Sequence, residues 1–284
     1  MGMTAFEFPG VQALSRTLTP IALTANLEKL PPHLPTLINW FIIFNFVQLV
    51  ISPIISSLVS TTYPTIKNKQ KWHMHIISQV HVLAVLPLVL RCLSAEPLAN
   101  DKLYGWDDRF GTLNAIAAAY FLWDTLNELI LADNLGFVLH GFACLVIYTF
   151  TFSPFLCYFA TRCLLWESST FFLNNHWFVL PGSTLLTQTE EKGGRFLDKT
   201  KQAGSTLQLV NGILLIAVFF CVRIVHGLWT SYNFWRTIMG ADLPFALYIA
   251  YCTGNLLLNG LNLMWFRKMI RVLQRRFNNP QKNE

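Results

Sequence analysis

The sequence predicts an all-α polytopic membrane protein with about seven transmembrane helices. Hydrophobic residues make up 53% of the 284 residues and charged residues only 13%. The mean hydropathy of +0.42 is too high for an ordinary soluble domain. The apolar residues also gather in runs long enough to cross a bilayer, and polar loops separate these runs.

The first three spans are expected at 37–59, 72–93 and 110–131. Trp40 marks one membrane interface of the first span, and Pro53 predicts a kink in it. The stretch from Leu135 to Leu173 is apolar throughout, and as one helix it would be roughly 58 Å long. We therefore expect it to fold back at Thr151–Pro154, because proline disfavours helix in the residue before it.

Two further spans are expected at 207–228 and 243–266, after a polar loop over 174–206. Behind the last span, apolar residues repeat at helical spacing up to Phe277 and basic residues fill the other side. This pattern predicts a separate amphipathic helix at the membrane surface. The cations that would contact the anionic leaflet are Arg267, Lys268, Arg271, Arg275 and Arg276.

The distribution of Lys and Arg predicts the orientation of the chain. With seven spans, the loops over 60–72 and 174–206 and the C-terminus lie on one side and contain most of the basic residues. The positive-inside rule then places the C-terminus in the cytosol and the N-terminus in the lumen.

Ionisable and amide side chains inside the predicted spans mark a candidate site, because such groups are costly in a membrane unless they face a polar interior. The central one is His140, within the apolar run from Phe137 to Phe152. We expect these groups to line a lipid pocket; the candidates are His81, Asp124, Asn127, Glu128, His140, Arg162, Glu167, Asn211 and Asn259. The predicted topology places seven of them in the cytosolic half of the membrane, namely His81, Asp124, Glu128, His140, Glu167, Asn211 and Asn259. It places Arg223 and His226 in the other half.

Other partners are not expected from the composition. The basic residues lie in loops and at the C-terminus and form no groove with stacking aromatics, so nucleic acid is not an expected partner. The six cysteines lie in or beside apolar runs without Cys-x-x-Cys spacing, which favours packing over zinc binding or disulfides. His73, His75 and His81 lack the paired spacing of a di-iron site, and no metal or other cofactor is expected.

The order of these features resembles the TLC domain. The resemblance rests on Trp72-x-x-His75-x-x-Ser78-x-x-His81, Tyr120-Phe121-x-x-Asp124, Leu139-His140, Glu167-Ser168-Ser169-Thr170, Asn175-x-Trp177, Asn211-Gly212 and Arg223. It implies an N-terminal segment with the first span at 1–66, a TLC domain with about six spans at 67–276 and a tail at 277–284. It also implies a helical barrel in the endoplasmic reticulum and is closest to the small TLC-domain-containing proteins.

The TLC domain is shared by the ceramide synthases, so the resemblance allows this chain to be compared with those enzymes. It implies that those enzymes use two adjacent histidines and a later Asp-x-x-Asp, whereas this chain has Gly141 after His140 and Thr170 three residues after Glu167. A non-catalytic protein of lipid binding or lipid homeostasis, connected with sphingolipids through the family, is therefore the first prediction. A divergent acyltransferase that uses His140 with Glu167 or Asp124, and acyl-CoA as substrate, is the alternative. A cargo-receptor or translocon-associated role is the third, and the oligomeric state is left open.

Overall fold

The computed structural model describes residues 7–59, 69–132, 134–179 and 206–278, and its regular secondary structure in these residues is entirely helical. Three helical stretches of this part are long and apolar enough to cross a bilayer, namely Pro31–Leu58, Lys69–Leu93 and Thr206–Ile238. Leu135–Phe150 is a shorter apolar helix. An all-helical membrane protein is therefore confirmed, and the number of seven spans stays a prediction.

The N-terminal region contains a helix that the sequence analysis did not predict. Helix α1 (Val11–Thr24) precedes the first span and packs Val11, Ser15 and Ala22 against its neighbours. The span itself consists of η1 (Pro31–His33), α2 (Leu34–Phe46), a π-helical turn η2 (Val47–Ile51) and α3 (Ser52–Val59). The irregular turn lies directly before Pro53, whose missing N–H and ring prevent regular α-helical bonding there.

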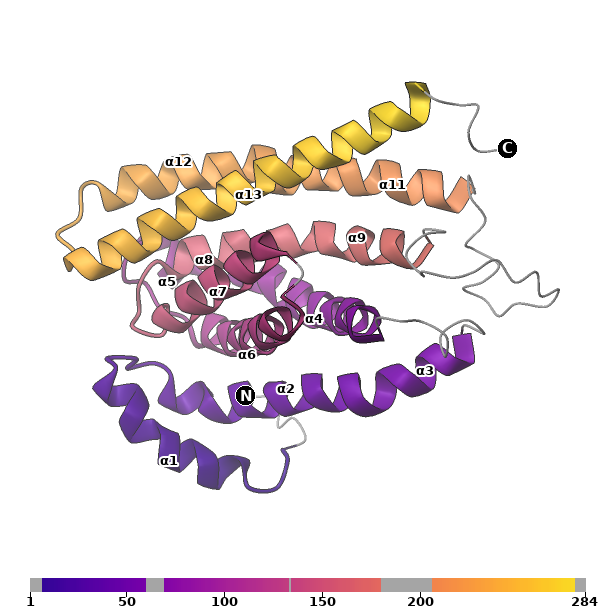
Figure 1. Cartoon of the computed structure of the whole chain (residues 1–284). Helices are drawn as coiled ribbons and strands as arrows, with labels where there is room; N and C mark the ends of the chain where they lie inside the picture. Colours follow the sequence, from indigo (N-terminus) through magenta and orange to yellow (C-terminus); the bar gives the residue numbers. More distant parts are fainter. Residues whose placement is uncertain (1–6, 60–68, 133, 180–205, 279–284) are drawn as a thin grey trace.

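Helix α6 (Asp108–Leu131) lies at the centre of the bundle and packs against α2, α4 (Lys69–Leu93) and α7 (Leu135–Phe150). Its run from Ala115 to Ala119 is buried, and such small side chains allow neighbouring helices to approach closely. The short helix α5 (Glu96–Asn100) occupies the loop between α4 and α6. Figure 1 shows α4, α5, α6 and α7 between the N-terminal helices, which include α1 and α2, and the two long helical stretches at the C-terminal end of the chain.

The chain folds back where the sequence predicts it. Helix α7 ends at Phe150, residues Thr151–Pro154 form turns, and α8 (Cys157–Cys163) follows. A short 3-10 helix, η4 (Leu164–Trp166), joins α8 to α9 (Glu167–Val179). Because α9 continues to Val179, the loop expected from residue 174 begins later; residues 180–205 lie outside the described part.

The last two helical stretches run past their expected ends. Helix α11 (Thr206–Phe219), the π-helical turn η5 (Phe220–Val225) and α12 (His226–Ile238) form one continuous stretch. Helix α13 (Phe245–Asn278) is one unbroken helix of 34 residues. The predicted helical extension to about Phe277 is therefore confirmed, but it continues the last span and does not begin as a separate helix after Phe266, because no helix-breaking residue interrupts the chain there. The contact of its cations with the anionic leaflet stays a prediction. The side chains of Arg275 and Arg276 lie outside the described residues.

Candidate functional site

A cavity of about 440 Å³ lies between helices that are far apart in the sequence: α4, α6, α7, α9, the stretch around η5, and α13. Its charged and polar lining residues are Lys71, His75, Ser78, Asp124, Glu128, Asn134, His140, Glu167, Ser169, Thr170, Asn174, Arg223 and Lys268. Lys71 and Lys268 are exposed, whereas Glu167 and Arg223 are buried. The cavity, called here the polar cavity, thus leads from the surface to a buried pair of opposite charges.

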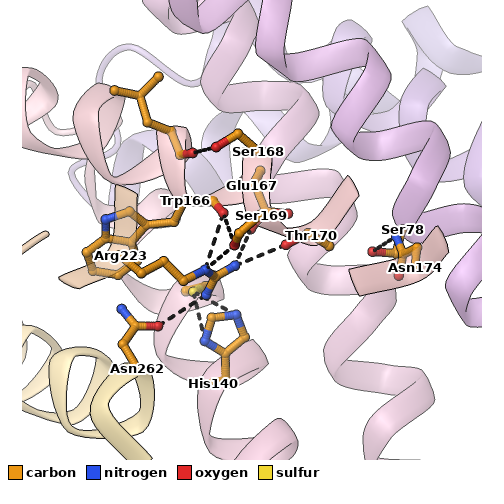
Figure 2. A network of polar contacts seen from close by, with 12 residues as sticks. Ser78, His140, Trp166, Glu167, Ser168, Ser169, Thr170, Asn174, Arg223 and Asn262 are labelled. Carbon is orange, nitrogen blue, oxygen red and sulfur yellow. Dashed lines mark hydrogen bonds and ion pairs between the residues drawn. The ribbon is translucent and has the colours of Figure 1, made fainter. Parts of the chain in front are cut away.

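Arg223 is the structural centre of the inner end of the polar cavity (Figure 2). Its guanidinium donates hydrogen bonds to Ser169 Oγ at 2.8 Å, Thr170 Oγ1 at 3.0 Å, and Trp166 O and Asn262 Oδ1 at 3.2 Å. Its Nη2 also lies 3.8 Å from Glu167 Oε1, and both side chains have less than a tenth of their surface exposed. Arg223 therefore connects η5 with η4, α9 and α13.

This arrangement explains how a charged residue is tolerated inside an apolar bundle. A buried guanidinium is costly unless nearly all of its N–H groups find acceptors and a counter-charge lies close. The segment Glu167–Thr170 supplies both, because its first turn places a carboxylate and two hydroxyl groups on the side of α9 that meets Arg223. Figure 2 shows these side chains pointing toward the guanidinium.

His140 is held mainly by aromatic contacts. Its ring packs edge-on against Trp265 of α13 at 5.4 Å between centroids and against Phe121 of α6 at 6.4 Å. The sulfur of Cys144, one helical turn further along α7, lies 3.9 Å from Nε2 and 4.0 Å from Nδ1. Asp124 and Glu167 line the same cavity, but no hydrogen bond or ion pair joins His140 to a carboxylate in the part of the chain described here.

Gly141 faces α6, and its lack of a side chain has a clear structural reason. A Cβ atom at this position would lie 3.0 Å from Thr125 Oγ1 and 3.1 Å from Asp124 Oδ2. Glycine thus permits α7 to pack closely on α6, with Asp124 and Thr125 directly against position 141. A histidine side chain at position 141 would have to displace these groups.

A second, smaller pocket of about 60 Å³ adjoins the polar cavity. The two share Phe121, His140 and Glu167 as lining residues. The remaining wall of the small pocket is mostly apolar and comes from α7, α8, η4, α12 and α13, with Tyr148, Leu156, Phe159, Phe234, Tyr251 and Leu258 among its members. Trp166 also lines it, and its buried Nε1 has no acceptor within the described residues.

The structure brings four of the nine predicted pocket residues together and places five elsewhere. Asp124, Glu128, His140 and Glu167 line the polar cavity. His81 does not line the cavity. Its ring stacks on Tyr120 with 3.8 Å between the ring centroids, and Tyr120 is the residue that lines the cavity at this place. Both ring nitrogens of His81 are buried without a partner among the residues described.

Asn127 lies on another side of α6, where it accepts a hydrogen bond from Gln48 at 2.9 Å. One residue along a helix corresponds to about 100°, so Asn127 and Glu128 face different neighbours. The remaining three residues form local or helix–helix contacts. Arg162 lies over the Tyr158 ring, Asn211 donates to Phe172 O, and Asn259 donates to Asn255 O.

The main residue that the sequence analysis missed is Arg223. It was placed in the lumenal half because the sixth span was expected to end at Leu228. The helical stretch in fact continues to Ile238, so Arg223 lies near its middle. The predicted separation in depth between Arg223 and Glu167 is therefore wrong. The sequence does contain a signal for this contact. An arginine inside an apolar span needs a counter-charge and acceptors, and Glu167–Thr170 offers a carboxylate and hydroxyl groups.

The fold and the cavity together define the class of protein. It is a helical membrane protein whose internal cavity contains a buried ion pair and borders an apolar pocket. The chain belongs to the TLC domain family, because the family model matches residues 71–271. The resemblance predicted from the sequence is confirmed.

Relatives named for the same domain cover most of this chain. An uncharacterized TLC domain-containing protein of Schizosaccharomyces pombe is 33% identical over 280 residues, which are 96% of this chain and 90% of the relative. Topoisomerase I damage affected protein 4 of Saccharomyces cerevisiae is 26% identical and covers 91% and 94% of the two chains. TLC domain-containing protein 4 of Homo sapiens is 26% identical and covers 81% and 84%. No solved structure matches the chain.

Proposed function

We propose that the protein is a non-catalytic TLC-domain protein that binds membrane lipid in the polar cavity and its apolar extension and acts in lipid homeostasis. The observation that supports this most directly is that two unlike spaces lie side by side and share Phe121, His140 and Glu167 as lining residues. A lipid has the same division into a polar head group and an apolar chain.

The orientation and location belong to the same proposal. Seven spans in a TLC-type barrel would place Lys71 and Lys268, two exposed residues of the polar cavity, on the cytosolic side together with the C-terminus. The N-terminus would then be lumenal and the membrane that of the endoplasmic reticulum. Cysteine accessibility at the two ends of the chain tests this topology, since labelling of both ends from one side contradicts an odd number of spans.

Two features of the site favour binding over catalysis. Gly141 occupies the position of the second histidine that the family resemblance implies for ceramide synthases, and close packing against Asp124 and Thr125 leaves little room there. Thr170, at the position of the second aspartate, accepts a hydrogen bond from Arg223 and so has a structural contact. Losing a positioned acid–base group commonly lowers a rate by about 10² to 10⁴.

The test is the identification by mass spectrometry of lipid that copurifies with the protein. We expect a bound lipid in the wild type and a loss of most of it in His140→Ala, since His140 lines both spaces. His226→Ala is the matched control, because His226 is half-buried on α12 and lines neither space. Absence of any enriched lipid in the wild type, or equal loss in both variants, contradicts the proposal.

The acyltransferase reading is the second candidate. It is favoured by one observation, namely that His140, Asp124 and Glu167 line the same cavity. Acyl-CoA-dependent ceramide formation by purified protein that is abolished in His140→Ala and retained in His226→Ala would establish this reading and reject the non-catalytic one. A cargo-receptor or translocon-associated role has only family membership in its support.

A further inference from the structure

Basic side chains from two distant parts of the chain line the exposed part of the polar cavity. Lys71 is near the start of α4 and Lys268 is in the last third of α13, and both are exposed and line the cavity. Arg267 and Arg271, which flank Lys268 on α13, are exposed as well. The proposed interior ligand does not account for this group of cations, which we call the basic rim.

The length of α13 places the basic rim at a definite level of the membrane. Its 34 residues extend about 51 Å, whereas the hydrocarbon core is about 30 Å thick. About 20 residues counted from Phe245 reach Trp265, a residue type that favours the membrane interface. Residues 267–271 then lie at the depth of the lipid head groups, where phosphate groups are concentrated.

The charges behind the basic rim decide where an anion can stay. The acidic side chains Asp124 and Glu128 also line the cavity, and an ionised carboxylate there repels a phosphate that moves deeper. The Arg223 guanidinium further inside is already paired with Glu167. A phosphate attached to a bilayer lipid can remain at the rim, because its chains stay in the membrane. A soluble phosphate ester with an apolar chain would have to pass the two carboxylates for that chain to reach the inner pocket.

We propose that the basic rim binds the phosphate group of an anionic phospholipid of the cytosolic leaflet, with Lys268 and Lys71 as its ligands and Arg271 as an adjacent positive charge. This lipid is distinct from the one proposed for the interior, and its head group covers the outer end of the cavity. The site goes beyond the proposed function, and it can exist whether or not the interior binds lipid.

The test uses the full chain in nanodiscs of phosphatidylcholine with one part in ten of phosphatidic acid. Native mass spectrometry counts the lipids that the released protein retains. We expect enrichment of phosphatidic acid over its bulk share in the wild type. Lys268→Glu should lower that enrichment about fivefold or more, since a cation near an anionic surface contributes about that factor. Arg236→Glu is the control, because Arg236 is an exposed cation of α12 that does not line the cavity.

The neutral variant Lys268→Gln and a salt series make the test independent of the folding of Lys268→Glu. We expect a smaller loss in Lys268→Gln, and a loss of enrichment in the wild type as ionic strength rises. No enrichment in the wild type, or equal losses in Lys268→Gln and Arg236→Glu, overturns the proposal. Displacement of phosphatidic acid by millimolar inorganic phosphate or coenzyme A also overturns it, in favour of a soluble phosphate. This count follows phosphatidic acid supplied in the nanodisc, whereas the interior test identifies lipid that copurifies with the protein, so a failure of the basic rim is distinguishable from a failure of the interior site.

Discussion

Replacing Arg223 with methionine tests whether the buried charge cluster holds the helices together. The substitution keeps a long unbranched side chain but removes the guanidinium that donates to Ser169, Thr170, Trp166 and Asn262. It also leaves Glu167, which is 7% exposed, without the opposite charge. We therefore expect a large loss of stability from a single substitution.

The magnitude follows from the burial of both partners. Removing one partner of a buried ion pair costs about 3–5 kcal/mol, mostly because the other charge stays in a medium that solvates it poorly. For a chain of this size the melting temperature should fall by roughly 10 °C. Adding Glu167→Gln to Arg223→Met removes the unpaired charge, so the double variant should be more stable than Arg223→Met alone.

The assay is thermal unfolding of purified protein in nanodiscs, followed by tryptophan fluorescence. Arg236→Met is the matched control, since Arg236 is exposed on α12 and a surface substitution should change stability by about 0.5 kcal/mol or less. The reasoning is refuted if Arg223→Met and Arg236→Met melt at the same temperature. It is also refuted if Glu167→Gln lowers the stability of Arg223→Met further.

Two smaller effects follow from local geometry. Gly141→His should destabilise the protein by about 1–3 kcal/mol through overpacking, because even a Cβ atom at this position is in close contact with Asp124 and Thr125; an unchanged melting temperature would show that α6 and α7 separate easily. Asp107 caps α6 by accepting from Arg109 N at 2.8 Å, so Asp107→Ala should cost about 1 kcal/mol. The hydrogen bond from the Arg109 side chain lowers the pKa of Asp107, and the stabilisation should therefore be present at neutral pH and disappear as the pH falls through that pKa. A difference in melting temperature that does not shrink in acid would contradict this assignment.

Two errors of the sequence analysis have a common cause in the ends of the helices. The π-helical turn η5 and the continuation to Ile238 lengthen the sixth helical stretch and move Arg223 to its middle. Continuous α-helical bonding through Phe266 removes the expected surface helix. Hydropathy marks where a chain becomes polar, but a helix can continue beyond that point when no proline interrupts it.

The sequence by itself determined the membrane class, the helical content, the turn at Thr151–Pro154 and the family, because these depend on local composition, helical period and spaced motifs. It also selected His140 and Glu167, since an ionisable group in an apolar run is costly wherever the helix lies. Only the tertiary structure decided that Arg223 joins them while His81 and Asn127 lie outside the polar cavity. The physical reason is that each residue turns a helix by about 100°, so the neighbour that a side chain meets depends on how several helices are rotated and aligned in depth.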